Sequence, residues 1–62
     1  MEKELRFEEL RFGMRVKNSA GEIGTILQIL EPCNIHVLFS SGWISVYCLD
    51  KTKKEYDPLF NV

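Results

Sequence analysis

IHVLFSSGWISVYCL, residues 35–49, decides the fold class. Its first part alternates Ile35, Val37 and Phe39 with other side chains, and a short serine-serine-glycine link leads into a second run of similar composition. β-branched and aromatic residues favour a pleated, half-buried surface, and a tight glycine-containing link suits a hairpin. The stretch therefore predicts two antiparallel strands.

The second strand offers two faces that both contain large apolar residues. One set is Trp43, Ser45 and Tyr47, and the other is Ile44, Val46 and Cys48. We expect Ile44 and Val46 to meet Val37 and Phe39 in the core. The rest of the expected core is Met14, Val16 and Ile26. Trp43, Ser45 and Tyr47 would then face outward.

Earlier segments have the same strand character. Residues 13–17 (GMRVK) and 24–30 (GTILQIL) predict two further strands, and 53–56 is the expected place of a short fifth strand. Gly24 permits a bulge or a close backbone approach, and the spacing from Ile26 to Ile29 breaks strict alternation. Four to five short antiparallel strands joined by tight turns predict an all-β protein, a small barrel.

The chain is long enough for one domain, residues 1–62. We divide it into an N-terminal arm at 1–12, the barrel at 13–57 and a C-terminal tail at 58–62. The arm is expected to hold one helical turn at Glu8 to Leu10. In the tail, Leu59 and Phe60 are expected to pack back on the barrel.

Composition narrows the classes of function. Hydrophobic residues make up 45% and charged residues 27% of 62, and the net charge is -1. No net field therefore draws the chain to nucleic acid or to a membrane. The start of the chain is charged and does not read as a signal peptide, and no apolar run spans a bilayer. We expect a cytoplasmic protein whose Cys33 and Cys48 are reduced thiols.

The pattern FEELRFGMRV (residues 7–16), GEIGTI (21–26) and residues 35–49 resembles the Src-homology-3-like (SH3-like) and Tudor-like barrels. The resemblance covers about residues 7–50. It implies a small SH3-like barrel and does not imply one activity, because unrelated functions use this fold.

The same pattern resembles, more weakly, the plasmid-borne trimethoprim-insensitive (type II) dihydrofolate reductases. Their pore strand, Val-Gln-Ile-Tyr, corresponds here to Ile44, Ser45, Val46 and Tyr47. Tyr47 is retained, Ser45 replaces the glutamine, and the family's pore lysine falls on Asn18, one residue after Lys17. The groups that would hold folate and nicotinamide are mostly absent, so a reductase is only the third hypothesis.

The leading hypothesis is a non-enzymatic binding module. Trp43 and Tyr47 would form the centre of a contact surface, with Ser45 between them and Arg15 or His36 at its rim. Such a surface would bind a protein or peptide partner, or a second copy of the chain. The alternative is that the termini cover it, through Leu5, Phe7, Leu59 and Phe60.

A second hypothesis is nucleic-acid binding. If the barrel brings them together, one positive stripe would contain Arg11, Arg15, Lys17, Lys51, Lys53 and Lys54. Cations that neutralise phosphates beside stacking aromatic rings are typical of single-strand binding.

Metal and catalytic chemistry have little support in the sequence. Cys33, His36 and Cys48 are one ligand short of a structural zinc site, and no second paired motif supplies the fourth. His36 is the only histidine, and it stands in an expected strand. We therefore expect no metal, no cofactor and no enzyme.

Overall fold

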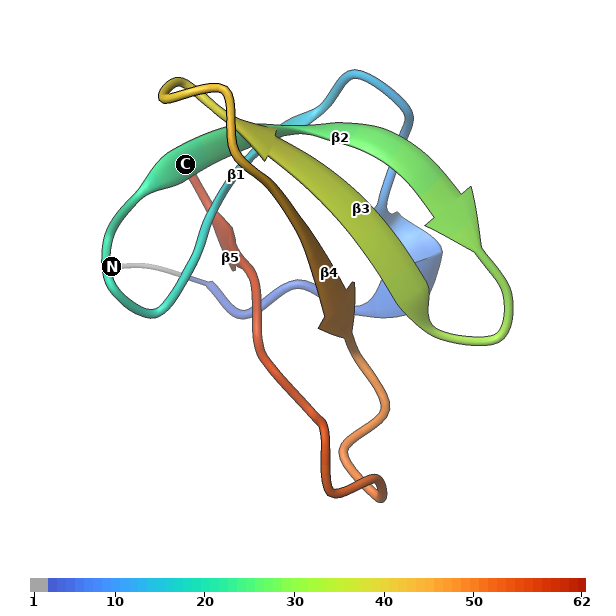
Figure 1. Cartoon of the computed structure of the whole chain (residues 1–62). Helices are drawn as coiled ribbons and strands as arrows, with labels where there is room; N and C mark the ends of the chain where they lie inside the picture. The colour runs from blue at the N-terminus through green and yellow to red at the C-terminus, as the bar shows by residue number, and fades with distance from the viewer. Residues whose placement is uncertain (1–2) are drawn as a thin grey trace.

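Five antiparallel strands form one sheet that curls into a half-barrel (Figure 1). The structure is a computed structural model and describes residues 3–62. The elements are η1 (Phe7–Glu9), β1 (Arg15–Lys17), β2 (Ile23–Leu30), β3 (Asn34–Phe39), β4 (Ile44–Cys48) and β5 (Phe60–Asn61). The order across the sheet is β4-β3-β2-β1-β5. The predicted all-β class is confirmed, and η1 is the helical turn expected in the arm.

Three residues, Ser40, Ser41 and Gly42, separate Phe39 at the end of β3 from Trp43, which stands directly before β4. Gly42 lies in the left-handed region with φ of 90°, which a side chain would disfavour. Its N–H donates to the Phe39 carbonyl at 2.8 Å, and the Phe39 N–H donates to the Trp43 carbonyl at 2.8 Å. These two bonds close a tight turn that ends at Gly42, and they place Phe39 opposite Trp43.

The register of this hairpin corrects the faces expected for β4. The strand pairs are Ile35 with Tyr47, His36 with Val46, Val37 with Ser45, and Leu38 with Ile44. Paired residues share a face, so Ser45 and Tyr47 join the inner face of β3. Ile44 and Val46 are 55% and 61% exposed, whereas Tyr47 is only 6% exposed. The prediction that Ile44 and Val46 are core and Tyr47 faces outward is wrong, because the link length fixes the pairing.

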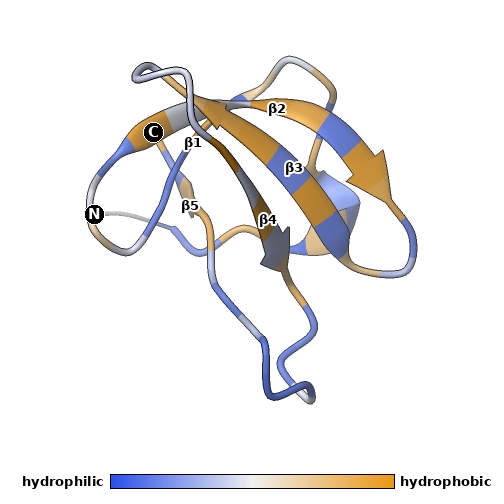
Figure 2. Ribbon diagram, in the orientation of Figure 1, coloured by the Kyte–Doolittle hydropathy of each residue, from blue (hydrophilic) through white to orange (hydrophobic). Residues whose placement is uncertain are grey.

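The core lies in the concave side of the sheet. Its fully buried side chains are Val16, Ile26, Ile35, Val37 and Leu59. In β3 every second residue is buried, namely Ile35, Val37 and Phe39. Figure 2 shows hydrophilic bands in the first half of this strand and hydrophobic residues throughout its second half. The expected core residues Val16, Ile26, Val37 and Phe39 are confirmed, and Met14 packs against them while partly buried.

Strand β2 is shaped by Gly24 and a bulge. A Cβ on Gly24 would lie 2.6 Å from Val37 Cγ1 and 2.9 Å from both Leu38 O and Phe39 Cδ1, so β3 approaches the backbone directly. The pairing with β3 shifts between Ile26 and Gln28. Both the close approach and the irregularity were predicted.

The two ends of the chain close the core together. The Leu5 N–H donates to the Leu59 carbonyl at 2.8 Å, and the Asn61 N–H donates to the Lys3 carbonyl at 2.8 Å. The fifth strand is β5, which pairs with β1, and the strand expected at 53–56 is wrong. Residues 51–55 form turns instead, and Tyr56 makes an isolated bridge to Cys48. Within residues 3–62, no helix has the length and hydropathy needed to cross a membrane.

Candidate functional site

The inner face of β4 continues past the core into a surface hollow of about 380 Å³. Its lining residues, which define the Trp43 hollow, are Glu22, Phe39, Ser41, Trp43, Ser45 and Tyr47. Three of the five residues predicted for the binding surface, Trp43, Ser45 and Tyr47, therefore lie together. They do so on the inner side of the sheet, at the end of β4, rather than on its outer face.

Trp43 is the exposed ring of this hollow. It is 71% exposed, because it stands one residue before β4 and beyond the buried part of the sheet. The alternative that the termini cover this face is wrong for Trp43, whereas Tyr47 is buried in one cluster with Leu5 and Leu59. An exposed tryptophan beside a hollow offers a large flat surface to a ligand.

Tyr47 forms the inner wall. Its ring meets Phe39 edge to face, with centroids 6.2 Å apart and planes at 64°. The Asn18 side-chain amide donates to the Tyr47 hydroxyl oxygen at 3.2 Å. The buried ring thus keeps its polar atom partnered, and Tyr47 is a fixed wall rather than a free anchor.

Asn18 also holds Glu22 at the hollow. Its side-chain amide donates to Glu22 Oε1 at 3.0 Å. Its side-chain oxygen accepts the N–H groups of Ala20 at 3.0 Å and Glu22 at 2.9 Å, which fixes the turn between β1 and β2. Sequence reasoning missed Glu22, and it named Asn18 only as the position of the pore lysine in the reductase resemblance. The Asn-Ser-Ala-Gly-Glu segment signalled a turn, but the hydrogen bonds of Asn18 to Glu22 and Tyr47 were not predicted.

Glu22 carries the only formal charge among the residues that line the Trp43 hollow. The other polar groups there are the hydroxyls of Ser41, Ser45 and Tyr47. A carboxylate beside an exposed indole ring suits a cation, since the ring face and the carboxylate both attract positive charge.

The two predicted rim residues lie elsewhere. His36 pairs with Val46 and with Gln28, on the outer face of the sheet. Arg15 pairs with Thr25 and borders a separate hollow with Leu38 on that same face. The structure therefore does not bring Arg15 or His36 to the Trp43 hollow.

The six basic residues do not form one stripe. Arg15 and Lys17 belong to β1, whereas Lys51, Lys53 and Lys54 lie in the loop after β4, which Figure 1 shows extending away from β1. Lys51 lies 3.8 Å from the Glu4 carboxylate. The stripe hypothesis required the barrel to bring these residues together, and the fold does not do so.

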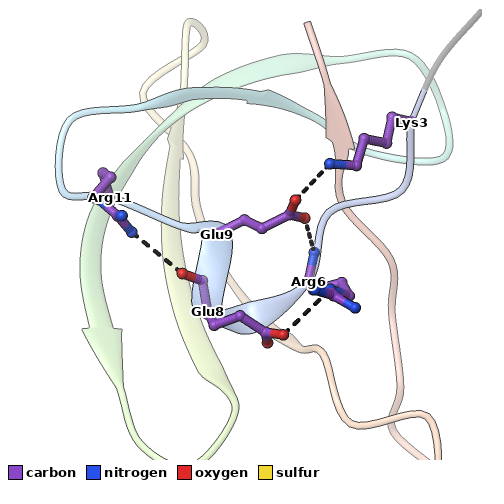
Figure 3. A network of polar contacts seen from close by, with 5 residues as sticks. All are labelled: Lys3, Arg6, Glu8, Glu9 and Arg11. Carbon is purple, nitrogen blue, oxygen red and sulfur yellow. Dashed lines mark hydrogen bonds and ion pairs between the residues drawn. The ribbon is translucent and has the colours of Figure 1, made fainter.

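Arg11 belongs to a polar network of the arm (Figure 3). Its guanidinium donates to the Glu8 carbonyl at 3.3 Å and to the Leu10 carbonyl at 2.9 Å. Arg6 pairs with Glu8, and Glu9 accepts from Lys3 and from the Arg6 N–H. The hydrogen bond from Lys3, then that from the Arg6 backbone, lowers the pKa of Glu9. The basic side chains of the arm thus have local partners.

A second hollow, of about 410 Å³, lies beside this arm. Its lining residues are Glu4, Leu5, Arg6, Phe7, Glu8, Leu49 and Lys51. The four charged side chains there pair with one another, Arg6 with Glu8 and Lys51 with Glu4. Its lining charges are therefore balanced within the hollow, whereas Glu22 is the one charged residue that lines the Trp43 hollow.

Cys33 and Cys48 are free, buried and in contact, with sulfur atoms 3.2 Å apart. The hydrogen bond with Cys48, followed by burial, raises the pKa of the Cys33 thiol. His36 lies on the outer face of β3, and within residues 3–62 no three His, Cys, Asp or Glu side chains are placed to hold a metal ion.

No family model, no curated protein and no solved structure matches this chain. The geometry of the half-barrel and of the Trp43 hollow therefore carries the functional argument.

Proposed function

We propose that this chain is a small, non-enzymatic binding module whose Trp43 hollow holds a lysine or arginine side chain of a protein or peptide partner. The observation that carries the proposal is the exposed Trp43 ring, 71% accessible, in a hollow whose only charge is the Glu22 carboxylate. A cation over a tryptophan face gains about 0.5–2 kcal/mol, more as water is excluded.

The arrangement also favours binding over catalysis. Tyr47 is held by Phe39 and by Asn18, so the wall of the hollow is rigid before a ligand arrives. His36, the only imidazole, is on the other face of the sheet, away from the hydroxyls and the carboxylate. Kinship with the SH3-like or Tudor-like barrels and a cytoplasmic location are parts of this proposal. The half-barrel supports the first, and the two free thiols support the second.

The test is a titration followed by amide chemical shifts, with short Gly/Ser peptides that differ only in one central residue. Peptides with central lysine or arginine should move the signals of Glu22, Trp43 and Ser45, and peptides with central glutamate or leucine should not. Equal shifts from all four peptides, or shifts confined to other residues, would contradict the proposal.

Variants sharpen the test. Trp43→Ala should weaken binding of the cationic peptides about tenfold without unfolding the domain. Glu22→Gln should weaken it by about threefold and reduce its salt dependence. Val46→Ala is the matched control, because it removes an exposed apolar side chain from the opposite face and should leave affinity unchanged.

Nucleic-acid binding is less well supported, because its basic residues lie in two separated groups. A titration with single-stranded oligothymidine at low salt separates nucleic-acid binding from binding of a cationic partner. Binding that weakens when Lys53 and Lys54 are replaced, and does not respond to Glu22→Gln, would favour nucleic acid over a cationic partner.

A further inference from the structure

The two thiols meet at the end of the β3–β4 hairpin that lies opposite its turn. Cys33 ends the turn before β3, and Cys48 is the last residue of β4. The Leu49 N–H donates to the Cys33 carbonyl at 3.0 Å, and Asn34 pairs with Cys48 in the sheet. The hairpin backbone thus holds the two cysteines side by side on neighbouring segments.

A second set of contacts fixes Cys48 from its other side. The Asp57 N–H donates to the Cys48 carbonyl at 2.8 Å, and Tyr56 forms a bridge with Cys48. The sulfur atoms, 3.2 Å apart, must approach by about 1 Å to reach the bond length of a disulfide, about 2.05 Å. Disulfide formation therefore requires only a small movement of the backbone.

We propose that Cys33 and Cys48 form a dithiol site that a small-molecule disulfide oxidises reversibly to an intramolecular disulfide. One cysteine thiolate attacks a sulfur of the small disulfide, whose S–S bond breaks and releases one small thiolate. The other cysteine thiolate then attacks the sulfur of the first cysteine in this mixed disulfide, which forms the bond between Cys33 and Cys48 and releases the second small thiolate. The protein loses two electrons and two protons, and the small disulfide is reduced to two thiols that take up those protons.

The cross-link has a definite structural consequence. It joins residues 15 apart in the sequence and so constrains the unfolded chain across the whole β3–β4 hairpin. Cys48 is at the opposite end of β4 from Trp43, and its neighbour Tyr47 is held by Phe39 and Asn18, so the Trp43 hollow should bind its ligand equally in both redox states. This proposal therefore stands or fails separately from the proposed function.

The rate of oxidation depends on how readily the small disulfide reaches the two thiols. Both side chains are buried, and the pKa of Cys33 is raised, so thiolate is scarce at neutral pH. Reaction requires a transient opening that exposes one sulfur, and oxidation should be slow compared with that of an exposed cysteine.

The experiment equilibrates the full chain in anaerobic buffers with a graded ratio of glutathione to glutathione disulfide. After acid quenching, intact mass should show a monomer lacking two hydrogen atoms, and a non-reducing digest should contain Cys33 and Cys48 in one linked fragment. The melting temperature should rise by about 10 °C or more on oxidation and return with dithiothreitol.

Cys33→Ser and Cys48→Ser, each checked for folding by circular dichroism, should show no rise in melting temperature in the same buffers. The digest of the unchanged chain keeps the test decisive if either variant unfolds. The proposal is overturned if both thiols persist in the most oxidising buffer. It is equally overturned if the products are only glutathione adducts or linked dimers, or if the disulfide lowers the melting temperature.

Discussion

In β4 the more apolar face is exposed to solvent and the less apolar face points inward. The outer face presents Ile44 and Val46 to solvent, whereas the inner face turns Ser45 and Tyr47 toward the core and the Trp43 hollow. The more apolar pair would be expected inside, yet the three-residue link at 40–42 aligns odd-numbered residues of both strands. In a hairpin this short, the length of the turn outweighs the hydropathy of one strand, because the buried face of β3 is already fixed.

Gly24→Ala tests the inner side most severely. The added methyl would meet Val37 Cγ1 at 2.6 Å and the Leu38 carbonyl oxygen at 2.9 Å, and the carbonyl cannot rotate away as a flexible side chain would. Unfolding free energy should fall by about 3 kcal/mol. Urea unfolding measures it, and a loss of less than about 1 kcal/mol would mean that β3 and β2 are less closely apposed.

Val37→Ala and Val46→Ala form a matched pair across the two faces. The same atoms are removed from a fully buried site and from one that is 61% exposed. We expect losses of about 1–3 kcal/mol at residue 37 and under about 0.5 kcal/mol at residue 46. Equal losses, or a larger loss at residue 46, would restore the expectation that Val46 is core.

Tyr47→Phe probes the polar contact of the inner face. It removes the oxygen that accepts from Asn18 while leaving the ring against Phe39. The free energy of unfolding should fall by about 1 kcal/mol. A double-mutant cycle with Asn18→Ala should show coupling, and strictly additive losses would argue that the two side chains do not meet.

The smallest expected effect is the change of stability with pH that comes from Cys33, which contacts Cys48 at the end of β4. Its pKa is raised above the ordinary 9.0 in the folded state, chiefly by the hydrogen bond with Cys48. The resulting stability is fully present below pH 9.0 and is lost as the pH rises through the folded pKa. In reducing buffer, urea midpoints should fall more between pH 8 and 10 for the unchanged chain than for Cys33→Ser. Parallel curves would contradict this.

The features that were predicted correctly from the sequence are those that depend on a single strand. Alternation identified Val37 and Phe39 as inward, and Gly24 was recognised as a point of close approach. The faces of β4 were missed because hydropathy was weighed without counting the residues of the turn. That count was in the sequence: three residues between Phe39 and Trp43 require both to share a face.

Contacts between distant segments were out of reach. The bond between Asn18 and Tyr47 spans 29 residues, and neither residue type announces its partner. The pairing of β5 with β1 has the same character, and the sequence predicts the fifth strand at 53–56 instead. Trp43 is exposed, as the binding hypothesis required, although the sequence left open that the termini cover it. Glu22 becomes a site residue only through the fold.

The hydrogen bond between Leu5 and Leu59 also bears on the order in which the protein folds. Leu59 is fully buried, and β1 gains its second neighbour only from Phe60 and Asn61. A sheet made of β1 to β4 alone would lack this partner, and its core would be open to water on one side. Because contacts between distant segments form more slowly than hairpins, we expect β2, β3 and β4 to pair first and residues 59–61 to close the core last.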